Sequence, residues 1–389
     1  MCEQNGALIR LIGVEVIEMK KLICILLIVL LGTTAFAEAP GNSLGFATLE
    51  RLYDGTGNQL LSPVSLALAL SMAADGTNGD TRAEMLNALA SESADWAALR
   101  ASLEKSGLKI ANAAFTAADL SVNSDYITRL NDEYAAEWFE MGADIVDKIN
   151  SWTNRHTDGL IEKLLDAAPD ADTQLILLNA VAMDAKWALP FDADATTDAT
   201  FHAPSSDATV PMMHKTAYLE YGETEIAQLL RLRYLDSDLT MLLALPKADH
   251  TEQEILAALS EQGLAYFSAI GEETRVQLAL PKVDFAAENG LNDALNAAGI
   301  QTAFTDLADF SGISDSPLYI GSVIQKARLI IDEDGTKAAA VTEISLPASA
   351  LITEEPIAFT ADHPFIAIVA DESTETACFA AVIANPGEN

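Results

Sequence analysis

Six apolar runs between residues 175 and 383 constrain the fold of this chain more than any other feature of its sequence. Polar residues interrupt them only at single positions, and the runs span residues 175–182, 239–245, 276–280, 327–331, 365–369 and 379–383. Short apolar runs of this kind predict strands that are covered on both faces of a sheet. Helical patterns fill residues 46–165, before the strands and without regular alternation with them, which predicts an α+β fold. No repeat, linker or charge block divides residues 38–389, so we expect one domain there.

Helix signals are clearest in the first half of the chain. Ser62 followed by Pro63 predicts an N-cap and a first helical residue. Thr81 with Glu84 three residues later predicts the capping box of a second helix. A further helical pattern occupies residues 149–165.

The net charge of the chain argues against several classes of binding partner. The chain holds 22 Lys and Arg against 58 Asp and Glu, which gives a net charge of −36. A surface this acidic repels nucleic acids, heparin-like polyanions and anionic membranes, so we expect none of these as partners. Repulsion between copies of the chain favours a monomer.

The first 37 residues have the organisation of a secretory signal. Two lysines precede an apolar run at residues 22–31, and Ala35 and Ala37 occupy the small-residue positions of a cleavage site. The run is too short to cross a bilayer, which takes about 20 residues. We therefore expect residues 1–37 to hold an upstream extension and a signal peptide, and the mature protein to be secreted. The alternative is a buried helix of the folded domain.

Cysteines and short catalytic motifs indicate no active site. Cys2, Cys24 and Cys378 cannot build a disulfide framework or a four-cysteine zinc site. The G-x-S-x-G match around Ser43 follows the expected cleavage site too closely to have the strand that a nucleophile elbow needs. No zinc-binding histidine pair, calcium loop or phosphate loop occurs. We expect no metal, no cofactor and no enzymatic activity; a secreted hydrolase built on Ser43 is the alternative.

Residues 333–353 have an unusual composition. Both charges among residues 336–347, Lys337 and Glu343, lie at odd positions. The even positions carry only small, apolar or hydroxyl side chains: Thr336, Ala338, Ala340, Thr342, Ile344 and Leu346. This alternation predicts a strand buried on one face, although small residues are poor strand formers. A segment that is exposed in one state and becomes a strand in another would need both the alternating pattern and the small side chains. The alternative is an alanine-rich surface helix.

The stretch Glu333-x-Gly335-Thr336-x-Ala338-Ala339-Ala340 resembles the hinge of the reactive-centre loop of the serpins. Further landmarks of this family recur in order along the chain. They are residues 58–65 (N-x-x-x-S-P-x-S), Asn150 to Gly159, Leu178-Asn179-Ala180-Val181, Leu280-Pro281-Lys282, residues 309–313, residues 362–365 and Asn385-Pro386. Their number, order and spacing make the resemblance specific over essentially the whole mature chain.

The resemblance implies a helical bundle on three β-sheets with an exposed reactive-centre loop at about residues 333–355. A target serine protease would cleave the loop and form a covalent acyl complex. The N-terminal half of the loop would then insert into the central sheet as a new strand. Such a native state is a kinetic trap, since the missing strand supplies the driving force.

The resemblance also implies roles for three groups of residues. The hinge, where insertion begins, would be Glu333, Gly335, Thr336, Ala338, Ala339 and Ala340. The polar shutter below the insertion gap would be Ser62, Ser65, Asn179 and Gln325. The breach at the top of the sheet would be Lys282, Glu333 and Trp187.

Three departures from the family pattern bear on these roles. Gln325 stands where the family usually has His, and Met183-Asp184-Ala185 stands where it has Phe-Lys-Gly. The chain between Gly107 and Ile149 is shorter than the family norm, which implies a trimmed helix. That helix often carries the basic heparin site of animal members, so we expect no heparin binding.

The scissile bond follows from the family's usual spacing after the hinge glutamate. That spacing predicts Ser349–Ala350 as the scissile bond and leaves Ala350–Leu351 and Leu351–Ile352 as alternatives. None of residues 348–352 is basic, which disfavours trypsin-like targets. Small residues indicate an elastase-like or subtilisin-like protease, whereas Leu351 would indicate a chymotrypsin-like one. The alternative function is a non-inhibitory serpin that acts in storage, transport or as a chaperone-like protein.

Overall fold

The computed structural model describes residues 39–91, 94–169, 173–336 and 355–388. Residues Ala39–Asn389 form one compact unit. The predicted signal segment, residues 1–37, lies outside the described residues, as do loop residues 337–354. Among the helices of the described residues, none is both long and apolar enough to cross a membrane.

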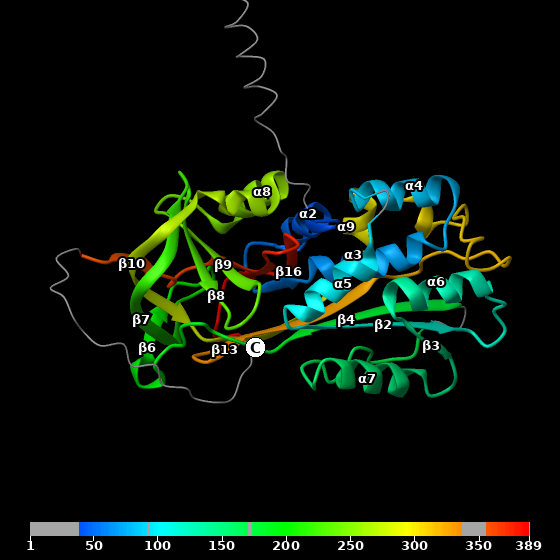
Figure 1. Cartoon of the computed structure of the whole chain (residues 1–389), viewed down its shortest axis with the longest axis horizontal. Helices are drawn as coiled ribbons and strands as arrows, with labels where there is room; N and C mark the ends of the chain where they lie inside the picture. The colour runs from blue at the N-terminus through cyan, green and yellow to red at the C-terminus, as the bar shows by residue number, and fades with distance from the viewer. Residues whose placement is uncertain (1–38, 92–93, 170–172, 337–354, 389) are drawn as a thin grey trace, which may run out of the picture. The chain divides into compact units, whose positions relative to one another are not determined.

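Most helices belong to the first half of the chain, as the sequence predicts (Figure 1). The α-helices are α2 (Asn42–Leu52), α3 (Pro63–Ala74), α4 (Gly79–Ala88), α5 (Trp96–Lys105), α6 (Ser124–Tyr134), α7 (Ile145–His156), α8 (Glu252–Gln262) and α9 (Asn292–Ala297). The described residues also contain three short 3-10 helices, η1 (Ala193–Ala195), η2 (Gly263–Ala269) and η3 (Thr302–Phe304).

The largest sheet has nine strands in the order β1-β16-β15-β9-β8-β7-β10-β14, with β6 paired to β7. Its strands are β1 (Gln59–Leu61), β6 (Thr197–Phe201), β7 (Ala208–Glu223), β8 (Ala227–Arg233), β9 (Leu239–Pro246), β10 (Ile270–Pro281), β14 (Ile357–Thr360), β15 (Phe365–Asp371) and β16 (Thr376–Ile383). The long β7 pairs with β6 along its first residues, with β10 over most of its length and with β8 at its end. These pairings make β7 the strand that joins β6, β8 and β10 in one continuous sheet.

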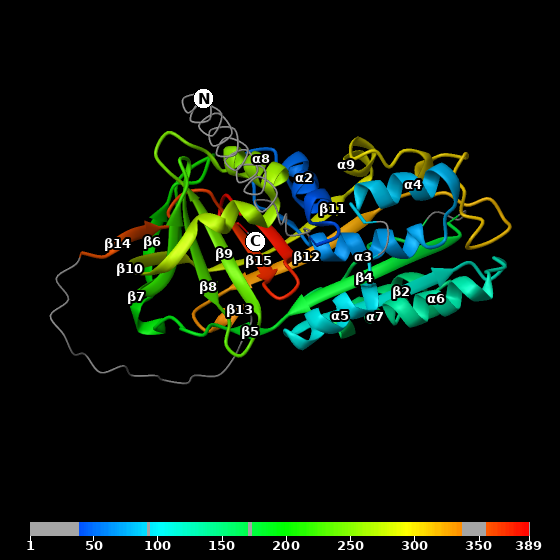
Figure 2. The same cartoon turned by 45° about the horizontal axis from the view of Figure 1, so that its top comes forward.

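The remaining strands form a second sheet in separate pieces. One piece has the order β3 (Glu137–Glu140), β2 (Leu108–Thr116), β4 (Leu175–Met183), and the other pairs β11 (Val283–Gly290) with β12 (Ile324–Ile331). Figures 1 and 2 show β4 and β12 side by side. Among the described residues they share no ladder; a two-residue pairing of β5 (Ala185–Lys186) with β13 (Gly335–Thr336) lies just beyond their ends.

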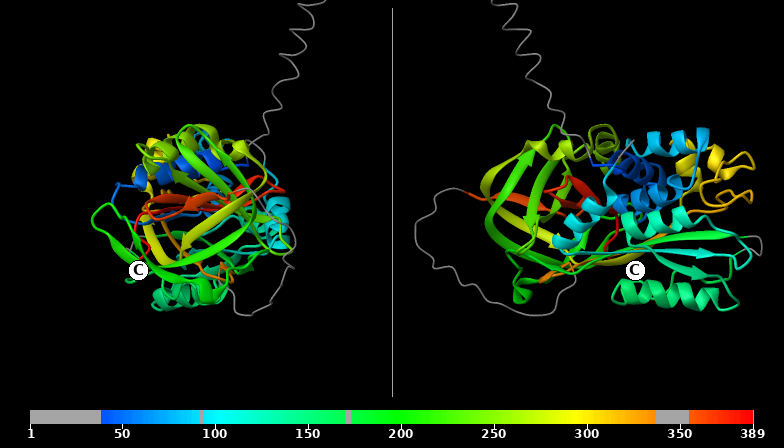
Figure 3. Two further views of the ribbon diagram at one scale, coloured as in Figure 1. Left: turned by 90° about the vertical axis from the view of Figure 1, so that its left-hand side faces the viewer. Right: turned by 45° about the vertical axis from the view of Figure 1, so that its right-hand side comes forward.

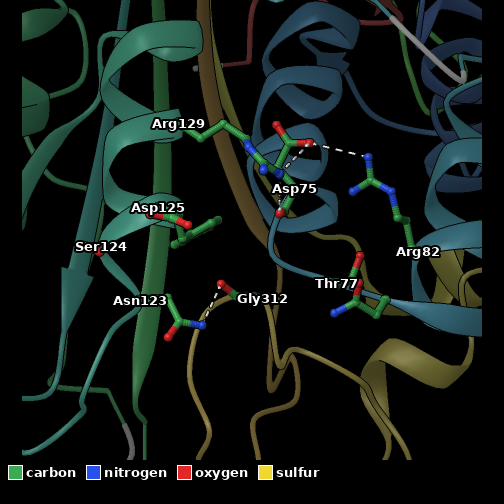
Figure 4. Close-up of a pocket in the computed structure, with 10 residues that line it drawn as sticks. Asp75, Thr77, Arg82, Asn123, Ser124, Asp125, Arg129 and Gly312 are labelled. Atoms are coloured by element: carbon green, nitrogen blue, oxygen red, sulfur yellow. Dashed lines mark hydrogen bonds and ion pairs between the residues drawn. The ribbon is translucent and has the colours of Figure 1, made fainter.

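Helix α3 is the central helix of the core. All of its residues except Ala69 are buried, and it packs against β4 and β16. Ser62 is its N-cap, as predicted, and accepts a hydrogen bond from the Ser65 backbone. At the other end, Arg82 and Arg129 converge on the C-cap residue Asp75 (Figure 4). Their guanidinium groups donate to the carbonyl oxygens of Ala74 and Asp75, so two cations complete the C-terminus of the helix.

The piece containing β4 is covered on both faces, which explains its continuous apolar run. Ala113, Phe115, Leu178 and Ala180 on β2 and β4 pack with Ile145, Ile149 and Trp152 of α7 in a separate cluster. Figure 1 and the right view of Figure 3 both show α7 across this sheet from α6. Residues Val181 and Met183 belong instead to the main core.

The structure corrects three local predictions. The capping box at Thr81 is wrong: α4 begins two residues earlier, and Glu84 binds the backbone of Gln301 and Thr302. Glu84 is therefore occupied by backbone groups far away in the sequence and does not cap its own helix. The helical pattern at 149–165 ends at His156, and the mainly helical region 46–165 also contains β2 and β3.

Candidate functional site

The candidate site is the discontinuity of the second sheet. In the described chain, β4 has only β2 as a strand neighbour and β12 has only β11, so each presents one unpaired edge. We call these two edges the sheet opening. Unpaired strand edges carry N–H and C=O groups that readily bind another strand. The two edges of the sheet opening are therefore the places where one further strand would pair.

The first residues of such a strand are already in place. The chain turns after β12: the Asp332 amide donates to the Gly335 carbonyl at 3.0 Å, and Asp332 Oδ1 accepts from the amides of Asp334 and Gly335. Gly335 and Thr336 then run antiparallel to β5, opposite Lys186 and Ala185.

Gly335 is required by close backbone approach. A Cβ at this position would lie 2.1 Å from the Ala185 carbonyl oxygen and 2.8 Å from the Lys186 Cα. The resemblance implies only that Gly335 belongs to the hinge, whereas the structure gives a steric reason for a glycine at this position. Thr336 beside it is buried, and its hydroxyl lies 2.6 Å from the hydroxyl of Tyr234.

Trp187 contacts the turn that contains the first hinge residues. Its ring stacks on Tyr234 with centroids 4.6 Å apart. Its indole nitrogen donates to the Asp332 carbonyl at 2.9 Å, and its backbone amide donates to the Asp334 carbonyl at 2.9 Å. Trp187 thus fixes the turn that leads from β12 into β13.

A charged contact holds Glu333 in the same turn. Lys282 Nζ lies 2.5 Å from Glu333 Oε2, and the Thr196 hydroxyl donates to Glu333 Oε1 at 2.8 Å. Burial opposes ionisation of Glu333, but the hydrogen bonds from Lys282 and Thr196 and the charge of Lys282 outweigh it and lower its pKa. Burial also raises the pKa of nearby Asp332.

Ser62 and Gln325 meet at the other end of the sheet opening. The Ser62 amide donates to Gln325 Oε1 at 2.8 Å, and Gln325 Nε2 donates back to the Ser62 carbonyl at 3.0 Å. The Ser62 hydroxyl donates to the Cys378 carbonyl at 2.7 Å. This double hydrogen bond ties β12 to the start of α3. Because an amide does not titrate, these bonds do not change with pH.

Asn179 does not join that group. Its Nδ2 donates to Asn112 Oδ1 at 2.8 Å on the neighbouring strand β2, and Asn112 in turn donates to the Tyr134 carbonyl. Asn179 Oδ1 is buried with no hydrogen-bond partner among the described residues. The four residues predicted as the shutter therefore divide between the two sides of the sheet opening.

Several predicted residues lie outside the described chain. These are the hinge alanines Ala338, Ala339 and Ala340 and the candidate reactive residues Ser349, Ala350, Leu351 and Ile352. Sequence reasoning missed Tyr234 and Thr196. No local signal marks either residue, because Tyr234 meets a partner 102 positions away and Thr196 one 137 positions away.

Two chemical alternatives gain no support from the geometry. Ser43 lies in the first turn of α2, and the described residues before it, 39–41, form no strand. Within the described residues, no group of three or more His, Cys, Asp or Glu side chains could hold a metal ion.

Substituting Gly335 by Ala should separate β13 from β5, because the new Cβ would overlap the Ala185 carbonyl oxygen. We expect faster hydrogen exchange of residues 332–336, measured by mass spectrometry. Gly290→Ala is the control, since no atom lies within 4 Å of a Cβ built there. Unchanged exchange in Gly335→Ala would contradict the steric argument.

Substituting Lys282 by Ala should free Glu333 and shorten the lifetime of the monomer on mild heating, followed on native gels. Because the folded-state pKa of Glu333 lies below its ordinary value of 4.5, the contact stabilises the hinge above that pH and is lost as the pH falls through the lower value. Wild type should therefore lose lifetime on acidification, and the variant should be short-lived already at pH 7. Lys148→Ala, which breaks an exposed pair with Asp144, is the control. Equal lifetimes of wild type and Lys282→Ala would rule out this role.

The chain resembles proteins of known family over nearly all of its length. The model of the family described as Serpin (serine protease inhibitor) matches residues 40–386. An uncharacterized serpin-like protein of Thermococcus kodakarensis is 34% identical over 363 residues, covering 89% of this chain and 84% of that protein. The leukocyte elastase inhibitor of Bos taurus is 30% identical over 367 residues, with 88% and 96% covered.

Solved structures give the same result. Tengpin, a thermophilic serpin crystallised in the native state, superposes with a TM-score of 0.82 at 28% identity, covering 91% of this chain and 95% of that one. Human thyroxine-binding globulin complexed with thyroxine superposes with a TM-score of 0.78 at 27% identity, with 90% and 98% covered. The predicted helices on mixed sheets are confirmed, and the chain belongs to the serpin family.

Proposed function

We propose that this serpin is a secreted inhibitor of serine endopeptidases that traps its target covalently and is not itself a catalyst. The observation that carries the proposal is the pairing of Gly335 and Thr336 with β5 at one end of the sheet opening. A strand that has begun at this point needs only a free continuation to fill the sheet. Cleavage of the loop would supply that continuation.

The existing register defines how the strand would continue. Gly335 lies opposite Lys186 and Thr336 opposite Ala185. In the same register, Ala338 would lie opposite Met183, and Ala340 opposite Val181. Both partners are buried in the main core, so only small side chains fit opposite them without displacing neighbours.

The same register supports a role for two polar residues of the loop. Thr342 would lie opposite Asn179, whose Oδ1 is buried and unpartnered among the described residues. A threonine hydroxyl there could donate the missing hydrogen bond. Lys337 would lie opposite Asp184, which pairs opposite charges across the strands. The inserted strand would thus complete groups that the native sheet leaves unsatisfied.

The chemistry belongs largely to the target protease. Its serine would attack a carbonyl within residues 348–352, form an ester with the loop and release the new amine, which takes its proton from the protease histidine. Insertion of residues 336–348 would then carry the ester-linked protease away before water hydrolyses the ester. This chain supplies the scissile bond and the driving force of strand insertion.

Specificity rests on the residues around the scissile bond. No residue from 348 to 352 is basic, so the pocket of a trypsin-like enzyme would lack its cation. Small side chains suit an elastase-like or subtilisin-like protease, and one relative bears the name leukocyte elastase inhibitor. We propose Ser349–Ala350 as the cleaved bond, with Ala350–Leu351 and Leu351–Ile352 as alternatives. The net charge of −36 argues against heparin or nucleic acid as a partner and favours a monomer.

A non-inhibitory role is the second candidate. Thyroxine-binding globulin shares the fold and is solved in complex with thyroxine, so a protein of this fold can bind a small molecule. Against this stands the composition of the hinge, where three alanines follow Thr336 and would meet the steric demand of insertion. A carrier would place no such demand on these residues.

Incubation with pancreatic elastase or subtilisin should give an SDS-stable band of inhibitor plus protease. Thr336→Arg should abolish the band and leave only cleaved inhibitor, because Thr336 is already 5% exposed in the uncleaved protein, and an arginine there would displace the two residues from which the new strand extends. Thr216→Arg, on the exposed face of β7, should behave as wild type. Failure of the wild type to form the band with elastase, subtilisin or chymotrypsin would refute the inhibitory function.

Cleavage within residues 348–352 should raise the melting temperature by about 10 °C or more. A new strand adds two ladders of backbone hydrogen bonds, and each hydrogen bond contributes roughly 0.5–1.5 kcal/mol to stability. Each kcal/mol raises the melting temperature by about 2 °C in a domain of this size class. An ordinary cut loop leaves stability unchanged or reduced. Calorimetric scans before and after limited elastase digestion make the comparison. A cleaved protein that melts at or below the intact one would show that the fold stores no such strain.

A further inference from the structure

Tyr234 is fixed against the strand end that receives the hinge. It follows β8 and is 2% exposed. An isolated antiparallel bridge pairs it with Trp187, and the Leu235 amide donates to the Lys186 carbonyl at 2.7 Å. Lys186 is also the residue opposite Gly335. Backbone contacts on both sides therefore set the position of the Tyr234 ring relative to β5.

The ring has little freedom within that frame. It stacks on Trp187 at an interplanar angle of 14°. Burial raises the pKa of Tyr234, so the phenol stays protonated and can donate a hydrogen bond. The hydroxyl lies 2.6 Å from Thr336 Oγ1, and both residues are buried. One hydroxyl donates and the other accepts, and no hydrogen-bond partner of the Thr336 side chain other than Tyr234 is found within the described residues.

The hydrogen bond between Tyr234 and Thr336 makes docking of the hinge depend on which side chain occupies position 336. A buried hydroxyl without a partner is costly, so Thr336 would leave its site if Tyr234 offered no hydroxyl. Valine, which has nearly the shape of threonine, would fill the same space without making the bond. The contact thus distinguishes a hydroxyl side chain from an apolar one at the point where strand insertion starts.

We propose that Tyr234 is a positioning residue: its hydroxyl holds Thr336 docked against β5 and so favours insertion of the loop over release of the cleaved protein. The inference rests on the inhibitory function proposed above. With the hinge docked, the new strand extends from two residues already in register. With the hinge released, the first pairing must form after cleavage, while hydrolysis of the acyl complex competes.

The test compares Tyr234→Phe, Thr336→Val and the double variant with wild type. The measured quantity is the ratio of cleaved inhibitor to SDS-stable complex with whichever of elastase, subtilisin or chymotrypsin the wild type traps. Each single variant should raise this ratio about two- to tenfold, the factor that one net hydrogen bond produces. The double variant should raise it no further than the singles, and Thr336→Ser should restore the wild-type ratio.

Tyr266→Phe is the matched control. Tyr266 on η2 also lies next to a threonine hydroxyl, that of Thr224 at 3.3 Å, and is similarly buried, but it contributes nothing to the hinge turn. The Tyr266→Phe variant should give the same ratio of cleaved inhibitor to SDS-stable complex as wild type. A rise as large as that of Tyr234→Phe would show a general effect of lost tyrosine hydroxyls and would overturn the proposal.

A second measurement does not depend on protease trapping. Hydrogen exchange of residues 332–336 in the uncleaved protein should be faster in Tyr234→Phe and in Thr336→Val than in wild type or Tyr266→Phe. Unchanged exchange in both variants, or additive effects in the double variant, would overturn the proposal even if the wild type inhibits. If the wild type traps no protease, the inhibitory function fails, whereas the exchange rates still decide whether Tyr234 docks the hinge.

Discussion

Within the described residues of this serpin, β4 and β12 share no ladder, and the contacts around them hold the two pieces of the second sheet in place. β4 is apolar and largely buried, and β12 is buried at alternate positions, so unpaired backbone groups on their buried parts are costly. The sheet can remain in this state only if other contacts hold its two pieces. Those contacts are found at the two ends of the sheet opening, and they differ in chemistry.

At one end the contact is neutral. Gln325 on β12 exchanges two hydrogen bonds with the backbone of Ser62, which is also the N-cap of the central helix α3. The amide therefore ties one sheet piece to the core rather than to the other sheet piece. Because neither partner ionises, this end should respond to packing changes and not to pH.

At the other end the contacts are charged, aromatic and hydroxylic. Lys282 holds Glu333, Trp187 holds the carbonyl groups of Asp332 and Asp334, and Tyr234 meets Thr336. The turn that leaves β12 is thus fixed residue by residue, up to the last position before the loop. Within the described residues, the start of the hinge is therefore held by several specific contacts.

The sequence alone determined the elements and much of the site. Apolar runs identified six of the strands, and Ser62-Pro63 identified the start of α3, because apolar burial and helix capping leave local signatures. The predicted cover on both faces is wrong for β12, which is buried at alternate positions, and for β10 at Gln277, which is exposed. The family motifs identified Lys282, Glu333 and Trp187, which the structure brings into one turn. The functional roles of these residues stay predictions.

Only the tertiary structure decided how those residues act. Glu84 binds a loop more than 200 positions away instead of capping its own helix, and Asn179 pairs with Asn112 rather than with Ser62. Gly335 is needed because a carbonyl oxygen from another strand approaches its Cα, and Tyr234 meets Thr336 across 102 positions. Each depends on a contact between segments far apart in the chain. Such contacts have no local pattern, since they exist only once the whole core has fixed where each backbone runs.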